Sequence, residues 1–309
     1  MNWLLFSAGI LMYLQFNVAN SARDTAPFFS WQRGGDTVEH LVVASGERKP
    51  EAPELVATDS LGPILTAASA AVADTASGAI LWEKNADDVR SIASLTKLMS
   101  LLVIIESGLP QDVEIELTGQ DYTSLGYNNF STGERILMRD LFATALIASD
   151  NSAMQALART TGMGQDIFVK RMNTRAHELG LSKTTFVDTT GLSGENVSTA
   201  REVIQLAAHA FRKPDIATFA GRKTYSFTAV SGTPHTVYST NLLLGGMVQV
   251  TAGKTGYVTD SGYNFVAEAV NDSEDAIIAV VLGSDSIADR FQDYKMLAVW
   301  AWENYKWSD

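Results

Sequence analysis

The apolar positions along this chain fall into two strand-like regions separated by a long stretch with helical spacing. The first region, residues 67–83, holds two short apolar runs around the turn Thr75-Ala76-Ser77-Gly78, a pattern typical of a β-hairpin. From Ser94 onward, apolar spacing and glycine or proline breaks predict helices over residues 94–106, 139–148, 152–160, 166–179 and 199–211. The first of these is apolar nearly all round, so we expect it to be buried.

Strand patterns return after the helical stretch. Apolar, β-prone runs at 247–251, 262–270 and 276–282 predict three strands, and a helix over 288–305 closes the chain. Because strands come from both ends of the chain with helices between them, the expected fold class is α/β (α+β). We expect an antiparallel sheet of about five strands, flanked by helices, with an inserted helical subdomain.

The N-terminal segment has a different character. Residues 3–16 are almost continuously apolar; about 14 residues is shorter than the ~20 that a membrane-spanning helix needs but typical of a signal-peptide core. Ala19-Asn20-Ser21 supplies small residues where a signal peptidase could cut. No lysine or arginine precedes the apolar run, which leaves an uncleaved anchor open. Residues 1–20 are therefore predicted to be a signal peptide or an N-terminal anchor, and the protein to be exported.

The next segment, residues 21–60, shows no sustained period. It contains Gly34-Gly35, Pro50 and Pro53, so we expect a flexible linker. The folded domain is expected to extend over residues 61–309, a length that can bury a sizeable core.

Charge and composition narrow the classes of function. The 309-residue chain has a net charge of -12 and no run of Lys or Arg, which argues against nucleic acid as a partner because such binding needs a basic patch. The absence of cysteine excludes cysteine nucleophiles, cysteine-zinc sites and disulfides. A His-Glu-x-x-His zinc motif is missing as well, since His177-Glu178 has no second histidine at that spacing.

The most informative polar stretch is Ser94-Leu95-Thr96-Lys97, at the start of the first predicted helix. Residues three apart share a helix face, so the Ser94 hydroxyl and the Lys97 amine would lie one turn from each other. A serine hydroxyl is a poor nucleophile, and a lysine kept neutral by burial could take its proton. The same spacing also fits a helix with a polar first turn, so the pair indicates catalysis only if other parts of the chain supply partners.

Two further polar sites stand at turn positions. In Ser149-Asp150-Asn151, between two predicted helices, the serine could relay a proton and the asparagine could bind an amide, although all three residue types also favour helix caps. In Lys254-Thr255-Gly256, after a β-prone run, the lysine and hydroxyl could hold a carboxylate, and the glycine would let another chain approach closely. The alternative for this second site is a plain turn.

In this order, the three motifs resemble those of the penicillin-recognising serine acyltransferases. The flanking sequence is similar to that of the low-molecular-mass penicillin-binding proteins, which are serine-type D-alanyl-D-alanine carboxypeptidases and related endopeptidases of β-lactamase-like fold. The resemblance extends over residues 64–305. It rests on the three motifs and on residues 72–74, 77–78, 83–87, 93–99, 186–192, 198–201 and 254–264.

The resemblance implies a catalytic role for three residues, Ser94, Lys97 and Ser149. Ser94 would attack the carbonyl between two D-alanines of a peptidoglycan stem peptide and form an acyl-enzyme, with Lys97 as the base. Lys97 would need a pKa depressed by burial and by a nearby cation, for which Lys254 is a candidate. Ser149 would pass a proton to the leaving amine.

The same resemblance implies the substrate contacts. Asn151 would bind the substrate amide, and Lys254 with Thr255 would bind its carboxylate beside Gly256. Backbone N–H groups of Ser94 and Tyr257 would form the oxyanion hole. No metal or cofactor is implied. β-Lactam antibiotics would acylate Ser94 as substrate mimics, and the protein would work in the periplasm or cell envelope, tethered to the inner membrane by residues 3–16 if they are not removed.

Three alternative functions stay open beside the carboxypeptidase. A D,D-endopeptidase that cuts peptidoglycan cross-links is favoured by the Ser-Asp-Asn form of the second motif and by the chain's end at Asp309, directly after the closing helix. A β-lactamase would need a glutamate for deacylation in a Glu-x-x-Leu-Asn loop, which the sequence lacks. An inactive peptidoglycan-binding protein is disfavoured because Ser94, Lys97 and Lys254 are all present.

Overall fold

The computed structural model describes residues 50–57, 59–123 and 128–308. The predicted signal peptide or anchor, residues 1–20, and the predicted linker up to residue 49 lie outside the described residues. Within the described ranges, no helix combines the length and the hydropathy needed to cross a membrane.

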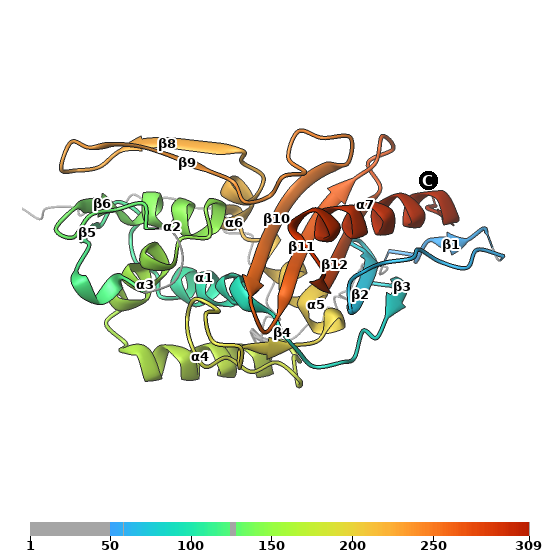
Figure 1. Cartoon of the computed structure of the whole chain (residues 1–309), viewed down its shortest axis with the longest axis horizontal. Helices are drawn as coiled ribbons and strands as arrows, with labels where there is room; N and C mark the ends of the chain where they lie inside the picture. The colour runs from blue at the N-terminus through green and yellow to red at the C-terminus, as the bar shows by residue number, and fades with distance from the viewer. Residues whose placement is uncertain (1–49, 58, 124–127, 309) are drawn as a thin grey trace, which may run out of the picture. The chain divides into compact units, whose positions relative to one another are not determined.

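A five-stranded antiparallel sheet organises the described chain (Figure 1), with the strand order β10-β11-β12-β2-β3. Strands from the N-terminal and C-terminal parts join where β12 pairs with β2, with Ile278 opposite Ala73. The predicted α/β (α+β) fold class and sheet are confirmed. The strands are β2 (Ser69–Asp74), β3 (Ile80–Lys84), β10 (Gln249–Val258), β11 (Gly262–Val270) and β12 (Ala276–Ser284).

Helices cover both faces of the sheet. Side chains alternate between the two faces of a strand, and β12 carries apolar side chains on both, so each face must be shielded from water. Ile278 and Val280 belong to one hydrophobic cluster, and Ile277 and Val281 belong to another. The first cluster includes residues of α1 (Thr96–Glu106) and α5 (Ala200–Phe211), and the second includes α7 (Ile287–Asn304). The sheet is therefore the middle layer between helices.

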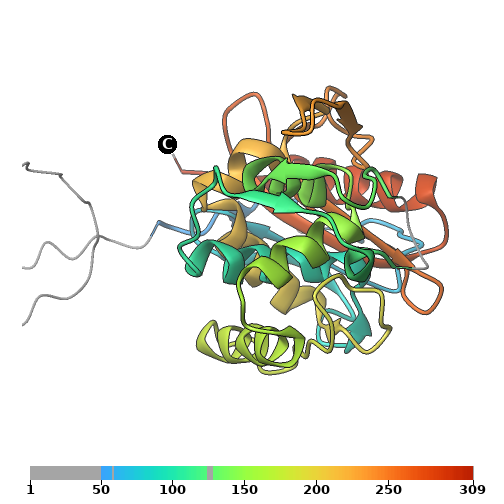
Figure 2. The same cartoon turned by 90° about the vertical axis from the view of Figure 1, so that its left-hand side faces the viewer.

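The inserted helical part lies between β3 and β10 in the chain. Its first helix, α1, contacts α2, α3, α4 and α5 and is buried from Thr96 to Ile104, which confirms the predicted burial. Figure 2 turns this part toward the viewer, with α4 below and the β8–β9 hairpin above. The remaining helices are α2 (Met138–Ile147), α3 (Asn151–Thr160), α4 (Gln165–Glu178) and α6 (Pro214–Ala220).

Short antiparallel ladders tie the longer elements together. The ladder of β4 (Arg90–Ser91) with β7 (Val197–Ser198), together with a bond from the Ile92 N–H to the Asn196 carbonyl, fixes the residues that precede Ser94. Two other ladders join β5 (Glu114–Glu116) to β6 (Arg135–Leu137) and β8 (Thr224–Thr228) to β9 (Pro234–Tyr238).

Two boundaries differ from the sequence prediction. At the end of the predicted linker, β1 (Glu54–Leu55) pairs with β13 (Tyr305–Lys306) next to the buried Pro53. A strand of two residues carries no hydrophobic period, so the sequence pattern could not indicate it. Ser94 also lies outside the α-helix, in the 3-10 turn η1 (Ala93–Leu95) that leads into α1.

Candidate active site

Ser94 and Lys97 lie together at the start of α1. Ser94 occupies the turn η1, in which Ala93 has a left-handed backbone with a φ of 47°. The Nζ atom of Lys97 lies 2.8 Å from Ser94 Oγ. The hydroxyl and the amine that the sequence placed on one helix turn are therefore within hydrogen-bonding distance.

Lys97 is fully buried, and its Nζ reaches segments from two other parts of the chain. It donates to Asn151 Oδ1 at 2.7 Å and to the Thr190 carbonyl oxygen at 2.9 Å. These two acceptors and Ser94 Oγ fix the position of the amine from three directions.

Burial sets the pKa of Lys97. It lowers the pKa to about 7, while the carboxylates of Asp150 and Asp188 act to raise it. That Lys254 contributes to this depression stays a prediction. Burial also lowers the pKa of Lys254 well below its usual value, and the charges of Lys97 and Arg290 lower it further. Near neutral pH, a large fraction of Lys97 is therefore able to accept a proton.

The Ser149-Asp150-Asn151 turn joins α2 to α3 and serves two purposes. Asp150 is the N-cap of α3, because its carboxylate accepts from the Ala153 N–H at 2.8 Å. Ser149 has a left-handed backbone with a φ of 58°. Its Oγ accepts from Lys254 Nζ at 2.7 Å. The motif therefore contains both a helix cap and site contacts: Asp150 caps α3, while Ser149 and Asn151 contact the two lysines.

Lys254-Thr255-Gly256 belongs to the regular strand β10, so the plain-turn alternative is wrong. Lys254 and Thr255 are buried. The strand passes beside the turn that carries Ser94, which places the motif opposite the Ser149 turn. The site is thus built between a strand edge on one side and helix ends on the other.

Two glycines allow distant main chain to press against η1. A Cβ on Gly256 would lie 2.8 Å from the Ile92 carbonyl oxygen and 3.1 Å from the Ser94 nitrogen. Gly191 has a φ of 85°, and a Cβ there would lie 2.0 Å from the Ala93 carbonyl oxygen. The close approach predicted at Gly256 is therefore present, and Gly191 adds a second one that the sequence did not indicate.

Loop 188–193 supplies the Thr190 carbonyl that accepts from Lys97, a contact that the sequence motifs do not indicate. Burial acts to raise the pKa of Asp188, but hydrogen bonds to its carboxylate outweigh this and the pKa is lowered. The loop is thereby fixed in the conformation that presents the Thr190 carbonyl to Lys97. The donors to the carboxylate are the backbone N–H groups of Thr190, Gly191 and Ser193, the Thr190 hydroxyl and Asn196 Nδ2.

The site opens into a cavity of about 610 Å³. Arg290 of α7 also lines it, and its Nη1 donates to the Gly256 carbonyl at 3.3 Å. Burial lowers the pKa of Arg290 to about 10, so the side chain stays positive at neutral pH. Six of the eight predicted site residues line this cavity, while Lys97 and Lys254 lie buried behind it: the six are Ser94, Ser149, Asn151, Thr255, Gly256 and Tyr257.

This fold, with a serine and two buried lysines at one cavity, defines a serine acyltransferase of the penicillin-recognising class. The D-alanyl-D-alanine carboxypeptidase family, peptidase family S11, matches residues 56–286. The match covers most of the chain, and the chain belongs to this family. The resemblance found in the sequence is thereby confirmed.

The similar proteins are named either D-alanyl-D-alanine endopeptidase or D-alanyl-D-alanine carboxypeptidase. A D-alanyl-D-alanine endopeptidase of Pseudomonas aeruginosa is 32% identical over 241 residues, which are 76% of this chain and 77% of that protein. An endopeptidase of Escherichia coli is 30% identical over 268 residues, 81% of this chain and 84% of that protein. A D-alanyl-D-alanine carboxypeptidase of Bacillus subtilis is 28% identical over 246 residues, 78% of this chain and 63% of that protein.

Solved structures show the same fold. The DD-transpeptidase of Streptomyces K15 aligns with a TM-score of 0.75 and 26% identity, covering 79% of this chain and 100% of that one. Penicillin-binding protein D2 of Listeria monocytogenes, in its cefotaxime-bound form, aligns with a TM-score of 0.70 and 30% identity, covering 79% and 100%.

Proposed function

We propose that this protein is a serine-type D-alanyl-D-alanine carboxypeptidase that acts on peptidoglycan stem peptides through an acyl-enzyme on Ser94. The observation that carries the proposal is the hydrogen bond between Ser94 Oγ and the buried Lys97 Nζ at the floor of a cavity that a peptide can enter. Family membership supports the same reaction class.

In acylation, Lys97 takes the proton of Ser94 as Oγ attacks the carbonyl carbon between the two D-alanines. The new ester bond forms and the C–N bond breaks, while Ser149 passes a proton to the leaving amine. Ser149 recovers its proton from the protonated Lys97, so the net transfer is one proton from Ser94 to the amine and Lys97 is neutral again. A pKa of about 7 for Lys97 suits this role, because a general base works best when its pKa is close to the working pH.

A positively charged side chain in the cavity can bind the carboxylate of the substrate. Arg290 lines the cavity and is charged, and its guanidinium is anchored by the Gly256 carbonyl. Thr255 also lines the cavity, and Lys254 precedes it in β10. We assign the carboxylate to Arg290 and Thr255, with Lys254 keeping Ser149 in position at 2.7 Å.

The developing oxyanion is assigned to the backbone N–H groups of Ser94 and Tyr257. The contact of β10 with η1 at Gly256 supports this, because it places the strand that carries Tyr257 against the turn that carries Ser94. One donor of this kind contributes about 2.7–4 kcal/mol to transition-state stabilisation. Water then cleaves the ester, with Lys97 again accepting a proton, and β-lactams enter as substrate mimics.

A second candidate function, D,D-endopeptidase activity on peptidoglycan cross-links, is favoured by the comparisons. The endopeptidases of three species are matched over 77%, 84% and 74% of their own length. The carboxypeptidases are matched over 60–65% of theirs. Both reactions use the same acyl-enzyme chemistry and differ in the leaving group.

The location is proposed from the substrate and from the N-terminal sequence. Peptidoglycan lies outside the inner membrane, and the apolar residues 3–16 suit export. We therefore place the protein in the periplasm or cell envelope, with residues 3–16 as a tether if they are retained.

Fluorescent penicillin tests the nucleophile directly. The purified protein should be labelled, and Ser94→Ala should not be labelled, while Ser193→Ala in the neighbouring loop serves as a control for serine loss. Labelling of the Ser94→Ala protein would overturn the assignment. Mass spectrometry after incubation with a stem pentapeptide and with a cross-linked muropeptide dimer then separates the two activities: loss of one D-alanine shows the carboxypeptidase, and conversion to monomers shows the endopeptidase.

A further inference from the structure

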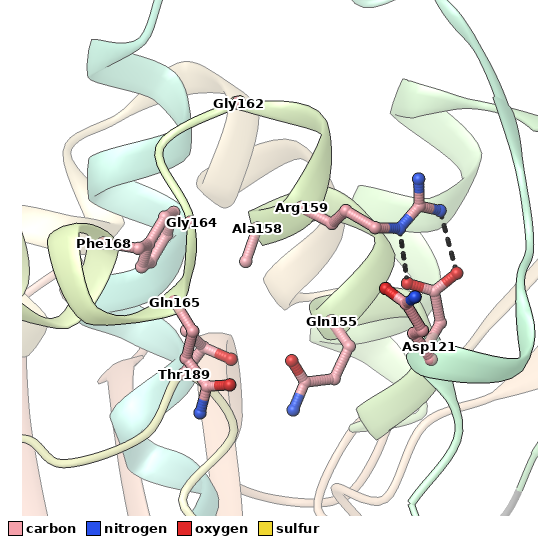
Figure 3. Close-up of a pocket in the computed structure, with 10 residues that line it drawn as sticks. Asp121, Gln155, Ala158, Arg159, Gly162, Gly164, Gln165, Phe168 and Thr189 are labelled. Atoms are coloured by element: carbon pink, nitrogen blue, oxygen red, sulfur yellow. Dashed lines mark hydrogen bonds and ion pairs between the residues drawn. The ribbon is translucent and has the colours of Figure 1, made fainter.

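A second cavity, of about 390 Å³, is lined by residues of α3 and of loop 188–193 (Figure 3), two segments that also contribute to the catalytic cavity. On α3, Asn151 faces the catalytic cavity and Gln155, one turn later, lines the second one. On the loop, Leu192 lines the catalytic cavity and Thr189 lines the second one. Nothing in the reaction described above uses this space, although its volume lies in the range of small-molecule sites.

Thr189 carries an unsatisfied polar group into this cavity. The side chain is 1% exposed, and its Oγ1 has no hydrogen-bond partner. A buried hydroxyl without a partner costs stability, and such groups in native proteins call for an explanation. A ligand that bonds to Thr189 Oγ1 would supply the missing partner.

The other polar groups of the cavity are uncharged or neutralised. Arg159 and Asp121 form a two-point ion pair with both distances 2.8 Å, which Figure 3 shows at one end of the cavity. Gln155 and Gln165 extend into the same space, and within the described residues their carboxamides make no hydrogen bond. Each carboxamide both donates and accepts. Phe168 gives the cavity an apolar side.

We propose that this cavity is a second binding site that takes an uncharged secondary-amide group of peptidoglycan. A secondary amide presents one N–H donor and one carbonyl acceptor, which match a carboxamide and a hydroxyl that lack partners, and its methyl or methylene neighbour suits the contact with Phe168. A charged group would find no unpaired opposite charge there. The proposal rests on the proposed function for the identity of the polymer, and the amide can come from an N-acetylated sugar or from a stem peptide.

Thr189 also links the second cavity to the catalytic one. Its carbonyl accepts from Ser100 Oγ at 2.7 Å, and the carbonyl of the next residue, Thr190, accepts from Lys97. A ligand on Thr189 is thereby held by the same loop that positions the base.

Binding should be measured by calorimetry on the full chain after acylation with penicillin, so that the catalytic cavity is already filled. The two probes are N,N′-diacetylchitobiose for the sugar source and N-acetyl-dialanine amide for the peptide source. We expect one probe to bind, and Thr189→Val and Gln155→Leu each to weaken it about tenfold. Thr174→Val, on α4 outside the cavity, is the matched control.

A thermal melt separates this role from a structural one. Because Thr189→Val removes a buried hydroxyl that has no partner, its melting temperature should not fall, whereas a hydroxyl needed for folding would lower it on removal. Failure of both probes to bind, or binding to Thr189→Val and Gln155→Leu as tight as to the unaltered chain, would overturn the proposal. Failure of penicillin to acylate the protein would instead contradict the proposed function, and the same titration on the untreated chain would still test the cavity.

Discussion

Two aspartates, the buried Asp150 and the half-buried Asp188, organise the two turns that meet at Lys97, and they do so differently. In the first turn, the Asp150 carboxylate caps a helix and also accepts from the backbone and side chain of Asn129. In the second turn, the Asp188 carboxylate has no helix to cap and folds its own loop around itself. Each turn delivers one acceptor to Lys97, a side-chain oxygen in one case and a backbone carbonyl in the other.

The comparison explains how a lysine can be held tightly and still be neutral. Within the described residues, neither carboxylate bonds to Lys97, and each acts on the amine through its charge alone. A direct ion pair would keep the amine protonated. Because uncharged oxygens make the contacts, burial dominates and brings the pKa of Lys97 to about 7.

Removing the amine at which both turns converge should have the largest effect. Lys97→Met keeps an unbranched side chain in the buried position but offers no base. We expect the rate of acylation by penicillin to fall by about 10²–10⁴-fold, the usual contribution of a general base. Rapid-mixing experiments with a fluorescent penicillin measure this rate, and Lys170→Met, exposed on α4, is the matched control. An unchanged rate would mean that another group takes the Ser94 proton.

The pH dependence of the unaltered protein tests the neutral lysine. Only the unprotonated amine can accept a proton, so the acylation rate should rise with pH and level off above the pKa of Lys97, about 7. Below that pKa the rate should fall about tenfold for each pH unit. Rates measured between about pH 5 and pH 9 would show the inflection, and a flat profile across this range would refute the role of Lys97 as the base.

The two aspartates should differ in stability when each is changed to asparagine. Asp188→Asn places an amide group where backbone N–H donors need an acceptor, so we expect a loss of about 1–3 kcal/mol in the free energy of unfolding. Asp150→Asn should cost less, because asparagine is also a good N-cap. Urea denaturation measures both losses.

The same two variants should agree in their effect on the pH profile. Each removes a negative charge that raises the pKa of Lys97, so each should move the acid limb of the acylation rate to lower pH. A larger stability loss for Asp150→Asn than for Asp188→Asn, or a shift to higher pH in either variant, would contradict the account of the two turns.

The fold was predictable because its signals are local. The short β-branched apolar run of β12 and the longer leucine-rich run of α1 each follow from a few neighbouring residues, and their length and residue types distinguish a strand from a helix. The residues of the three motifs were also accessible, since serine, lysine and asparagine at those spacings identify the family. Their side chains could be named before their geometry was known.

What the sequence could not provide depends on segments that meet only in the folded chain. The Thr190 acceptor is a backbone carbonyl, which carries no residue-type signal. Arg290 comes from the last helix and reaches the cavity through the packing of α7 against the sheet. The pKa of each of the two lysines depends on its burial and on charges from distant segments, which the spacing of the motifs does not reveal.

The contacts of Gly191 and Gly256 with the Ser94 turn make penicillin labelling a measure of folding. Both glycines touch the main chain of residues 92–94 from segments far away in the sequence, so Ser94, the proposed nucleophile, is in place only once both segments have docked. Contacts between distant segments are slow to form. A refolding chain that already has its helices should therefore remain unlabelled, and the appearance of label would time the final docking step.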